Sequence, residues 1–86
     1  MLDNVRRSQT MEMSRDQCRA ARALLRLSQP KLAQLSGVSL STIGNFESGL
    51  RRNVTSEKIM RIRVALELSG VVFNDNGGVK LRKGRR

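Results

Sequence analysis

The chain has 86 residues, enough for one small domain and too few for several. Its 17 Lys and Arg residues against 7 Asp and Glu give a formal charge of +10, which favours a polyanionic partner, either a nucleic acid or an anionic membrane surface. Only 2% of the residues are aromatic, which argues against modules that stack single-stranded bases on aromatic side chains. The lack of His and the single Cys remove the usual transition-metal ligands and the commonest general base, so we expect no metal, no cofactor and no enzymatic activity.

The sequence gives no indication of secretion or of membrane binding. Its one cysteine, Cys18, cannot form an intrachain disulfide, and we expect it to be a small buried apolar residue. No apolar run approaches the roughly 18 residues of a membrane span, and the basic helices have no broad exposed apolar face. We therefore expect a cytoplasmic protein with no membrane partner.

Residues 1–13 show no sustained hydrophobic period, and we interpret them as a flexible arm. Ser14 and Gln17 then have the spacing of a capping box, in which each side chain bonds the backbone N–H of the other. Apolar residues follow at three- and four-residue intervals, at Cys18, Ala21 and Leu25. This pattern predicts a first helix over residues 15–27.

Two short helices separated by a tight turn are predicted next. Ser28 is a good N-cap, Pro30 fits a first helical turn, and Gly37 permits the positive φ of a tight turn. Ser39 can cap the following helix and Gly49 can end it. The positions expected to be buried are Leu32, Ala33 and Leu35 in the second helix and Ile43 and Phe46 in the third.

Beyond a basic loop at residues 50–54, the sequence predicts a longer helix. Thr55 or Ser56 can provide its N-cap, and Gly70 can end it. Apolar residues recur between them at helical spacing, at Ile59, Ile62 and Leu66. Scattered basic residues on this helix and on the first are interpreted as a solvated face: Arg15, Arg19, Arg61 and Arg63.

A β-hairpin is predicted over residues 70–82. A two-residue turn at Asn76 and Gly77 would mix apolar and polar side chains on each face, whereas a five-residue loop puts four apolar side chains on one face. Because an isolated hairpin is marginally stable in water, that face must pack on the helices or on another subunit. We expect a dimer interface formed by Val71, Phe73, Val79 and Leu81. The alternative is that Val71 and Phe73 cap the core of the monomer.

The predicted organisation is therefore mainly α, with four parts. These are the flexible arm at residues 1–13, a helical domain at 14–69, the hairpin at 70–82 and a basic tail at 83–86. The tail is either an arm that contacts a polyanion or a solubilising end.

The second and third predicted helices have the spacing of a helix-turn-helix. Ala33 is small where the two helices cross, and Gly37 lets the chain reverse between them. The segments QPKLAQLSGVS (29–39) and TIGNFESG (42–49), extended upstream by RALL (22–25), resemble the Xre family, which is similar to the lambda and Cro repressors. The resemblance covers residues 17–68 and implies a four-helix, lambda-repressor-like DNA-binding domain.

The resemblance implies a role for each matching position. Base contacts are implied for Leu40, Ser41 and Asn45, phosphate contacts for Gln29, Ser39, Thr42, Arg51, Arg52 and Asn53, and a structural ion pair for Arg22 with Glu47. Because the third helix offers no Arg or Gln on that surface, we do not expect strong reading of guanine. Gly44 costs about 1 kcal/mol relative to Ala in mid-helix, and it either permits close backbone approach or is a tolerated weak position.

The function implied by the resemblance is sequence-specific regulation of transcription, by a repressor or controller. Such a protein binds double-stranded palindromic DNA as a homodimer, with half-sites about 10 base pairs apart. The alternative is an antitoxin or anti-activator that acts mainly through a protein partner. The arm at residues 1–13 is then the candidate for the partner contact.

Overall fold

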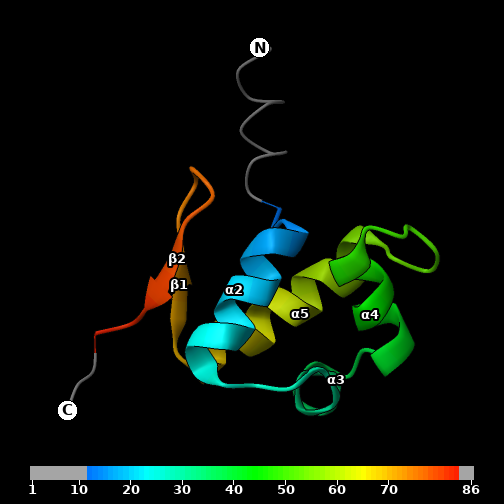
Figure 1. Cartoon of the computed structure of the whole chain (residues 1–86), viewed down its shortest axis with the longest axis horizontal. Helices are drawn as coiled ribbons and strands as arrows, with labels where there is room; N and C mark the ends of the chain where they lie inside the picture. The colour runs from blue at the N-terminus through cyan, green and yellow to red at the C-terminus, as the bar shows by residue number, and fades with distance from the viewer. Residues whose placement is uncertain (1–11, 84–86) are drawn as a thin grey trace.

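The structure is a computed structural model that describes residues 12–83. Within that range, four helices and an antiparallel two-stranded hairpin form the mainly α domain that the sequence predicts. Figure 1 shows α2 and α5 in the middle of the molecule, with α4 and the hairpin at opposite ends. The elements are α2 (Arg15–Leu25), α3 (Gln29–Ser36), α4 (Leu40–Ser48), α5 (Ser56–Ser69), β1 (Val71–Phe73) and β2 (Val79–Leu81).

Capping residues set the helix boundaries. Each helix follows a Ser or Thr whose side chain accepts a hydrogen bond from the backbone N–H three residues on: Ser14, Ser28, Ser39 and Thr55. Gln17 completes the predicted capping box by accepting a bond from the Ser14 N–H at 2.9 Å. Three helices end, as predicted, at a glycine with positive φ: Gly37, Gly49 and Gly70. The first helix ends earlier than predicted, at Leu25, because Arg26 adopts the left-handed conformation with a φ of 58°.

The hydrophobic core lies where the helices meet. Leu32, Ile43 and Leu66 are fully buried, as the sequence predicts. Leu35 was expected to be buried with Leu32, but it is 49% exposed because the eight-residue α3 meets the core only along the side that carries Leu32.

Met13 corrects the boundary of the predicted arm. This residue was predicted to lie in the arm, whereas it is only 3% exposed and belongs to the core cluster. The other residues of the arm, apart from Glu12, lie outside the described residues, as do residues 84–86 of the predicted tail.

The hairpin has the register that its apolar pattern predicts. Val71 pairs with Leu81 and Phe73 with Val79 across a five-residue loop. Val71 and Phe73 are 1% and 8% exposed, and the hairpin packs on α2 and α5. The predicted dimer contacts are therefore corrected at these two residues, which cap the core of their own chain. Val79 is half-buried, and Leu81 is 51% exposed.

Candidate nucleic-acid interface

The α3–α4 turn places one face of α4 on the core and leaves the other open. Gly37, with a φ of 73°, ends α3, and Val38 anchors the turn with 5% of its surface exposed. Ile43 and Phe46, at 0% and 4% exposed, seat α4 on the core. Leu40 is 47% exposed on the same helix. This is the arrangement of a helix that is supported from behind and free to enter a groove.

A buried carboxylate on α4, that of Glu47, links α4 to α2 and α3 through hydrogen bonds. Glu47 is 4% exposed and accepts two hydrogen bonds from Arg22 on α2, from Nε at 2.8 Å and from Nη2 at 2.7 Å. Gln29, the first residue of α3, donates its Nε2 at 2.9 Å, and the thiol of Cys18 donates at 3.1 Å. We call these four residues the Glu47 cluster. It contains the ion pair implied by the resemblance, and it shows that Cys18 is a hydrogen-bond donor as well as a buried residue.

Protonation states in the Glu47 cluster suit these bonds. Burial raises the pKa of Glu47, but hydrogen bonds from Arg22, Gln29 and Cys18 outweigh burial and hold that pKa below its ordinary value. Burial also raises the pKa of the Cys18 thiol, and the bond to Glu47 raises it further, so the thiol keeps its proton. The bond to Glu47 raises the pKa of Arg22. The cluster is thus a carboxylate held by three side-chain donors at neutral pH.

The residues expected to contact DNA from α4 differ in their accessibility. Leu40 and Ser41 are exposed, whereas Asn45 is half-buried and donates its Nδ2 to the Arg52 carbonyl at 3.1 Å. A bidentate pair with adenine uses Oδ1 and one of the two N–H groups of Nδ2, so the second N–H can keep its bond to the Arg52 carbonyl. The phosphate contact expected of Thr42 is corrected, since Thr42 is 3% exposed and its hydroxyl accepts a bond from the Ser39 hydroxyl at 2.9 Å.

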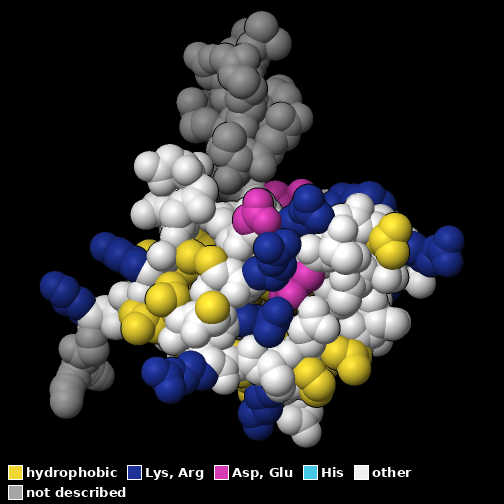
Figure 2. Space-filling model, in the orientation of Figure 1, with side chains coloured by type: hydrophobic (Ala, Val, Ile, Leu, Met, Phe, Trp, Pro, Cys, Tyr) yellow, Lys and Arg dark blue, Asp and Glu magenta, His cyan; other side chains and the backbone are white. Residues whose placement is uncertain are grey.

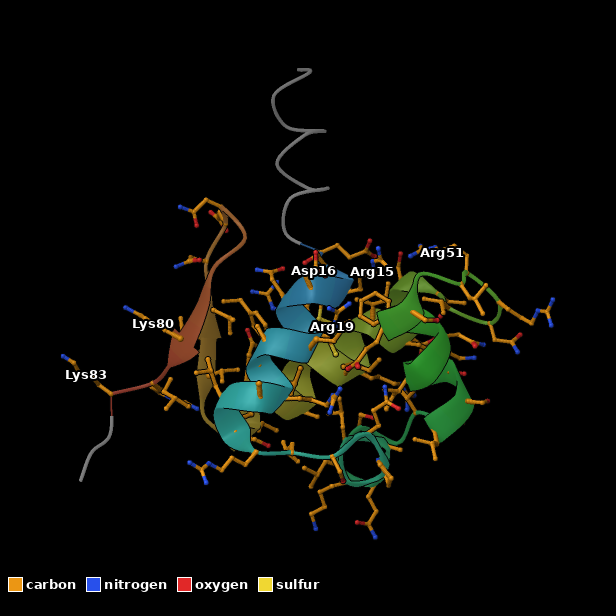
Figure 3. All side chains as sticks on the ribbon, viewed as in Figure 1. Arg15, Asp16, Arg19, Arg51, Lys80 and Lys83 are labelled. Carbon is orange, nitrogen blue, oxygen red and sulfur yellow. The ribbon has the colours of Figure 1, made fainter. Side chains whose placement is uncertain are left out.

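Two side chains fix the shape of the basic loop after α4. Asn45 holds the Arg52 carbonyl from α4, and Lys58 on α5 donates its Nζ to the Asn53 carbonyl at 3.2 Å. Asn53 adopts a φ of 62°, which Asn tolerates better than most residues. The side chains of Arg51 and Arg52 are exposed, and Figure 3 shows Arg51 at the end of the molecule opposite the hairpin. The loop therefore presents its charge beside α4 in a defined conformation.

Two further basic residues, Lys58 and Arg61 on α5, lie beside the α3–α4 turn. A cavity of about 230 Å³ separates this turn from α5, and its lining includes Ser39, Lys58 and Arg61. An Nη atom of Arg61 lies 3.7 Å from the position that a Cβ on Gly37 would occupy. Arg61 was predicted to lie on a solvated face, and no role was predicted for Lys58. Their three-residue spacing, on the helix that follows the basic loop, is the feature of the sequence that could have identified them as neighbours on one helix face.

Gln29 and Gly44 face each other across α3 and α4. The Gln29 Oε1 is the atom nearest to where a Cβ on Gly44 would lie, at 4.0 Å, which is an ordinary contact distance. The free protein therefore has room for a methyl group at this position. Any requirement for glycine has to come from a molecule that approaches α4.

No group of three or more His, Cys, Asp or Glu residues within residues 12–83 is placed to hold a metal ion. No helix of the described range has the length and apolar character needed to cross a membrane.

The turn between α3 and α4, the open face of α4 and its basic surroundings define a helix-turn-helix protein. Residues 19–73 match the family model for Helix-turn-helix (HTH_3). The chain belongs to this family, which is of the Xre and lambda-repressor type. It is therefore a DNA-binding transcriptional regulator. The comparison with curated proteins gave no match.

Proposed function

We propose that the protein regulates transcription, as a repressor or controller, by inserting α4 into the major groove of a palindromic operator as a homodimer. The observation that carries the proposal is the placement of α4. On α4, Ile43 and Phe46 are buried against the core, whereas Leu40 and Ser41 are exposed. The basic loop follows α4 directly. Recognition helices of this fold contact base edges from such a position.

The proposed contacts divide into bases and phosphates. Leu40 can touch a thymine methyl group, Ser41 can bond either kind of base edge, and Asn45 can pair with adenine through Oδ1 and one N–H of its amide. The phosphate contacts are proposed for charged and polar residues around α4: Gln29, Ser39, Arg51, Arg52, Asn53, Lys58 and Arg61. Charge is concentrated in this second set, so it supplies the salt-dependent part of the affinity.

We propose that the homodimer forms through α5 rather than through the hairpin. Three apolar side chains recur every fourth residue on α5 and are 54%, 41% and 81% exposed: Met60, Val64 and Leu68. The helix carries two acidic and three basic residues, so two copies meet less repulsion there than elsewhere on a chain with a charge of +10. Half-sites about 10 base pairs apart follow from a symmetric dimer.

Selection of bound fragments from random duplex DNA, followed by fluorescence anisotropy, tests the sequence specificity. Wild-type protein is expected to bind the selected site about 10³-fold or more tightly than a scrambled duplex at near-physiological salt. Asn45→Ala should weaken binding to the selected site more than binding to the scrambled duplex, because only the selected site loses a base contact. Arg51→Ala should weaken both and reduce the salt slope by about one. Equal wild-type affinity for the two duplexes would refute the proposal.

Sedimentation at micromolar concentration tests the homodimer. Leu68→Glu is expected to convert a dimer into monomers, because it places a charge at the most exposed apolar residue of the proposed contact. Leu35→Glu is the matched control, since Leu35 is also exposed but lies on α3. A Leu68→Glu protein that stays dimeric would disprove the α5 contact. A monomeric wild type whose selected site lacks twofold symmetry would disprove the homodimer itself.

A further inference from the structure

The two ends of the Gln29 amide have different surroundings. Its nitrogen, Nε2, donates a hydrogen bond to the carboxylate of Glu47 at 2.9 Å. No described residue donates a hydrogen bond to its oxygen, Oε1. Because every buried side-chain nitrogen or oxygen within residues 12–83 has a hydrogen-bond partner, this unpartnered oxygen is open to solvent. The phosphate contact proposed for Gln29 needs a donor, so it leaves the oxygen without a role.

Glu47 decides which end of the amide is free. A carboxylate only accepts hydrogen bonds, and this one is held in place by two bonds from Arg22, at 2.8 and 2.7 Å. Hydrogen bonds also hold the pKa of Glu47 below its ordinary value, so the group is charged at neutral pH. Turning the Gln29 amide over would place its oxygen against the carboxylate, and two acceptors would face each other with no proton between them. The amide is therefore kept with its nitrogen toward Glu47 and its oxygen away from it.

The free oxygen of Gln29 lies beside the open face of α4. It is the atom nearest to where a Cβ on Gly44 would be, at 4.0 Å. In a helix the Cα–Cβ bond points toward the N-terminus, so that position lies over the preceding turn, which carries Leu40 and Ser41. Residues three and four apart are neighbours on one helix face. The oxygen is thus a neighbour of the two exposed side chains for which base contacts are proposed.

The surroundings of this oxygen suit a base better than a phosphate. Figure 2 shows a surface over α4 that is mostly white, the colour of uncharged polar side chains and backbone, with Lys and Arg around it. The one charged residue within α4 is Glu47, which is buried. An amide oxygen cannot donate to a phosphate, but it can accept from the amino groups that adenine (N6) and cytosine (N4) present in the major groove.

We propose that Gln29 determines specificity at one position of each half-site, by accepting a hydrogen bond from a base amino group through its Oε1, with Glu47 as the positioning residue. The second N–H of Nε2 remains for the phosphate contact of the proposed function, on which this inference rests. Thymine and guanine present carbonyl oxygens, O4 and O6, which would face the Gln29 oxygen as a second acceptor. The side chain therefore selects adenine or cytosine and rejects thymine or guanine.

Sequencing of duplexes selected from a random pool by the full-length protein measures this preference. Wild-type protein is expected to select adenine or cytosine at one position of each half-site that becomes indifferent to the base in Gln29→Met, while the preferences at the other positions persist. Loss of a phosphate contact alone would weaken binding to all duplexes and leave every preference in place. Gln34→Met is the matched control, because Gln34 is exposed on the same helix, and it should keep the wild-type preferences.

Removing the amino group from the selected base identifies the atom that is read. Adenine is replaced by purine, or cytosine by 2-pyrimidinone, and binding is followed by fluorescence anisotropy. Wild-type protein is expected to bind the altered site about fivefold to tenfold more weakly, since the Gln29 oxygen is left without a donor. Gln29→Met should bind the two duplexes within about twofold of each other, which also controls for the weaker base pair.

Glu47→Gln tests the positioning role, at a temperature at which circular dichroism shows the variant to be folded. Its amide can donate to the Gln29 oxygen, so the Gln29 amide can turn and offer an N–H to the groove. The variant is expected to accept thymine or guanine at the position where wild-type protein selects adenine or cytosine. A purely structural role of Glu47 would lower affinity for all duplexes without changing the preference at one position.

Three results would overturn the inference. Unchanged preferences at every position in Gln29→Met would restrict Gln29 to a phosphate contact. Equal losses in wild type and Gln29→Met on removal of the amino group would assign that group to another residue. A wild-type preference in folded Glu47→Gln would show that Glu47 does not orient the amide. Each of these results differs from failure of the proposed function, in which the wild-type protein itself selects no sequence.

Discussion

Replacing Glu47 by Gln keeps the size of the side chain and removes its charge. In the wild type this carboxylate accepts bonds from Arg22, Gln29 and Cys18, and Arg22 also donates to the Leu27 carbonyl at 3.0 Å. In the variant, Arg22 loses its counter-charge, and its side chain is only 20% exposed to solvent. Removing one partner of a buried ion pair costs about 3–5 kcal/mol, and the partial exposure of Arg22 favours the lower end. We expect a loss of about 3 kcal/mol in the free energy of unfolding.

Urea unfolding followed by circular dichroism measures this loss, since the chain has no Trp or Tyr to report by fluorescence. For a domain of this size the loss corresponds to a fall in Tm of roughly 12–24 °C. Glu57→Gln is the matched control: its partner Arg61 is 3.4 Å away, but both side chains are more than half exposed, so a change of about 0.5 kcal/mol or less is expected. Combining Glu47→Gln with Arg22→Met should cost less than the sum of the single changes. A Glu47→Gln protein within about 1 kcal/mol of wild type would refute the reasoning.

The pH dependence of the same pair of proteins checks the charge of Glu47. Because its pKa is lowered in the folded state, the stabilisation is fully present above the unfolded-state pKa of about 4.3 and is lost as pH falls through the folded value. Glu47→Gln lacks this titration. The difference in unfolding free energy between wild type and variant should therefore shrink as pH is lowered from about 7 to about 3. A difference that stays constant would show that folding does not shift the pKa of Glu47.

Three further predictions concern α4, its basic surroundings and the N-terminal boundary of the core. Gly44→Ala should raise stability by about 1 kcal/mol, because the site is helical and has room for a methyl group; a loss of stability would show that Gln29 is more tightly packed than its 4.0 Å contact implies. If Gly44→Ala also weakens operator binding in anisotropy, the glycine serves the approach of DNA. Lys58→Ala and Arg61→Ala should each lower affinity for operator and scrambled duplex alike and reduce the salt slope by about one, whereas an unchanged slope would exclude phosphate contact. Met13→Ala should cost about 2–5 kcal/mol in thermal or urea unfolding because Met13 is 3% exposed; a change below about 1 kcal/mol would remove Met13 from the core.

Features set by neighbouring residues were predicted well from the sequence. A Ser or Thr cap bonds a backbone N–H three residues away, so Ser14, Ser28 and Ser39 could be recognised without knowing the tertiary structure. The hairpin register was also predictable, since only a five-residue loop brings the apolar side chains to one face.

Features set by tertiary packing were predicted less well. Periodicity put Leu35 on the apolar side of a helix, but it cannot tell how much of that side a short helix buries. Met13 precedes the first periodic segment, so its burial depends on contacts that leave no local pattern. Cys18 was correctly expected to be buried, yet its bond to Glu47 depends on the crossing of α2 and α4.

The candidate interface also combines features that neighbouring residues determine with features that tertiary packing determines. The chemistry of Leu40 and Ser41 follows from their positions in the motif, and both are exposed. The bond from Asn45 to the Arg52 carbonyl was not foreseeable, because it requires the loop to fold back over α4. Lys58 and Arg61 were underestimated because a helical pattern alone does not reveal that α5 begins beside the α3–α4 turn.

In the proposed complex, the bond between Asn45 and Arg52 would link the reading of bases to the contacts with phosphates. Pairing with adenine would use Oδ1 and one N–H of the Asn45 amide, which leaves the second N–H for the Arg52 carbonyl. The basic loop would then be held by Asn45 and by the Lys58 bond to the Asn53 carbonyl on an operator as it is in the free protein. Specific binding would therefore gain a base contact without giving up an internal one, and the loop would present the same conformation to operator and scrambled DNA.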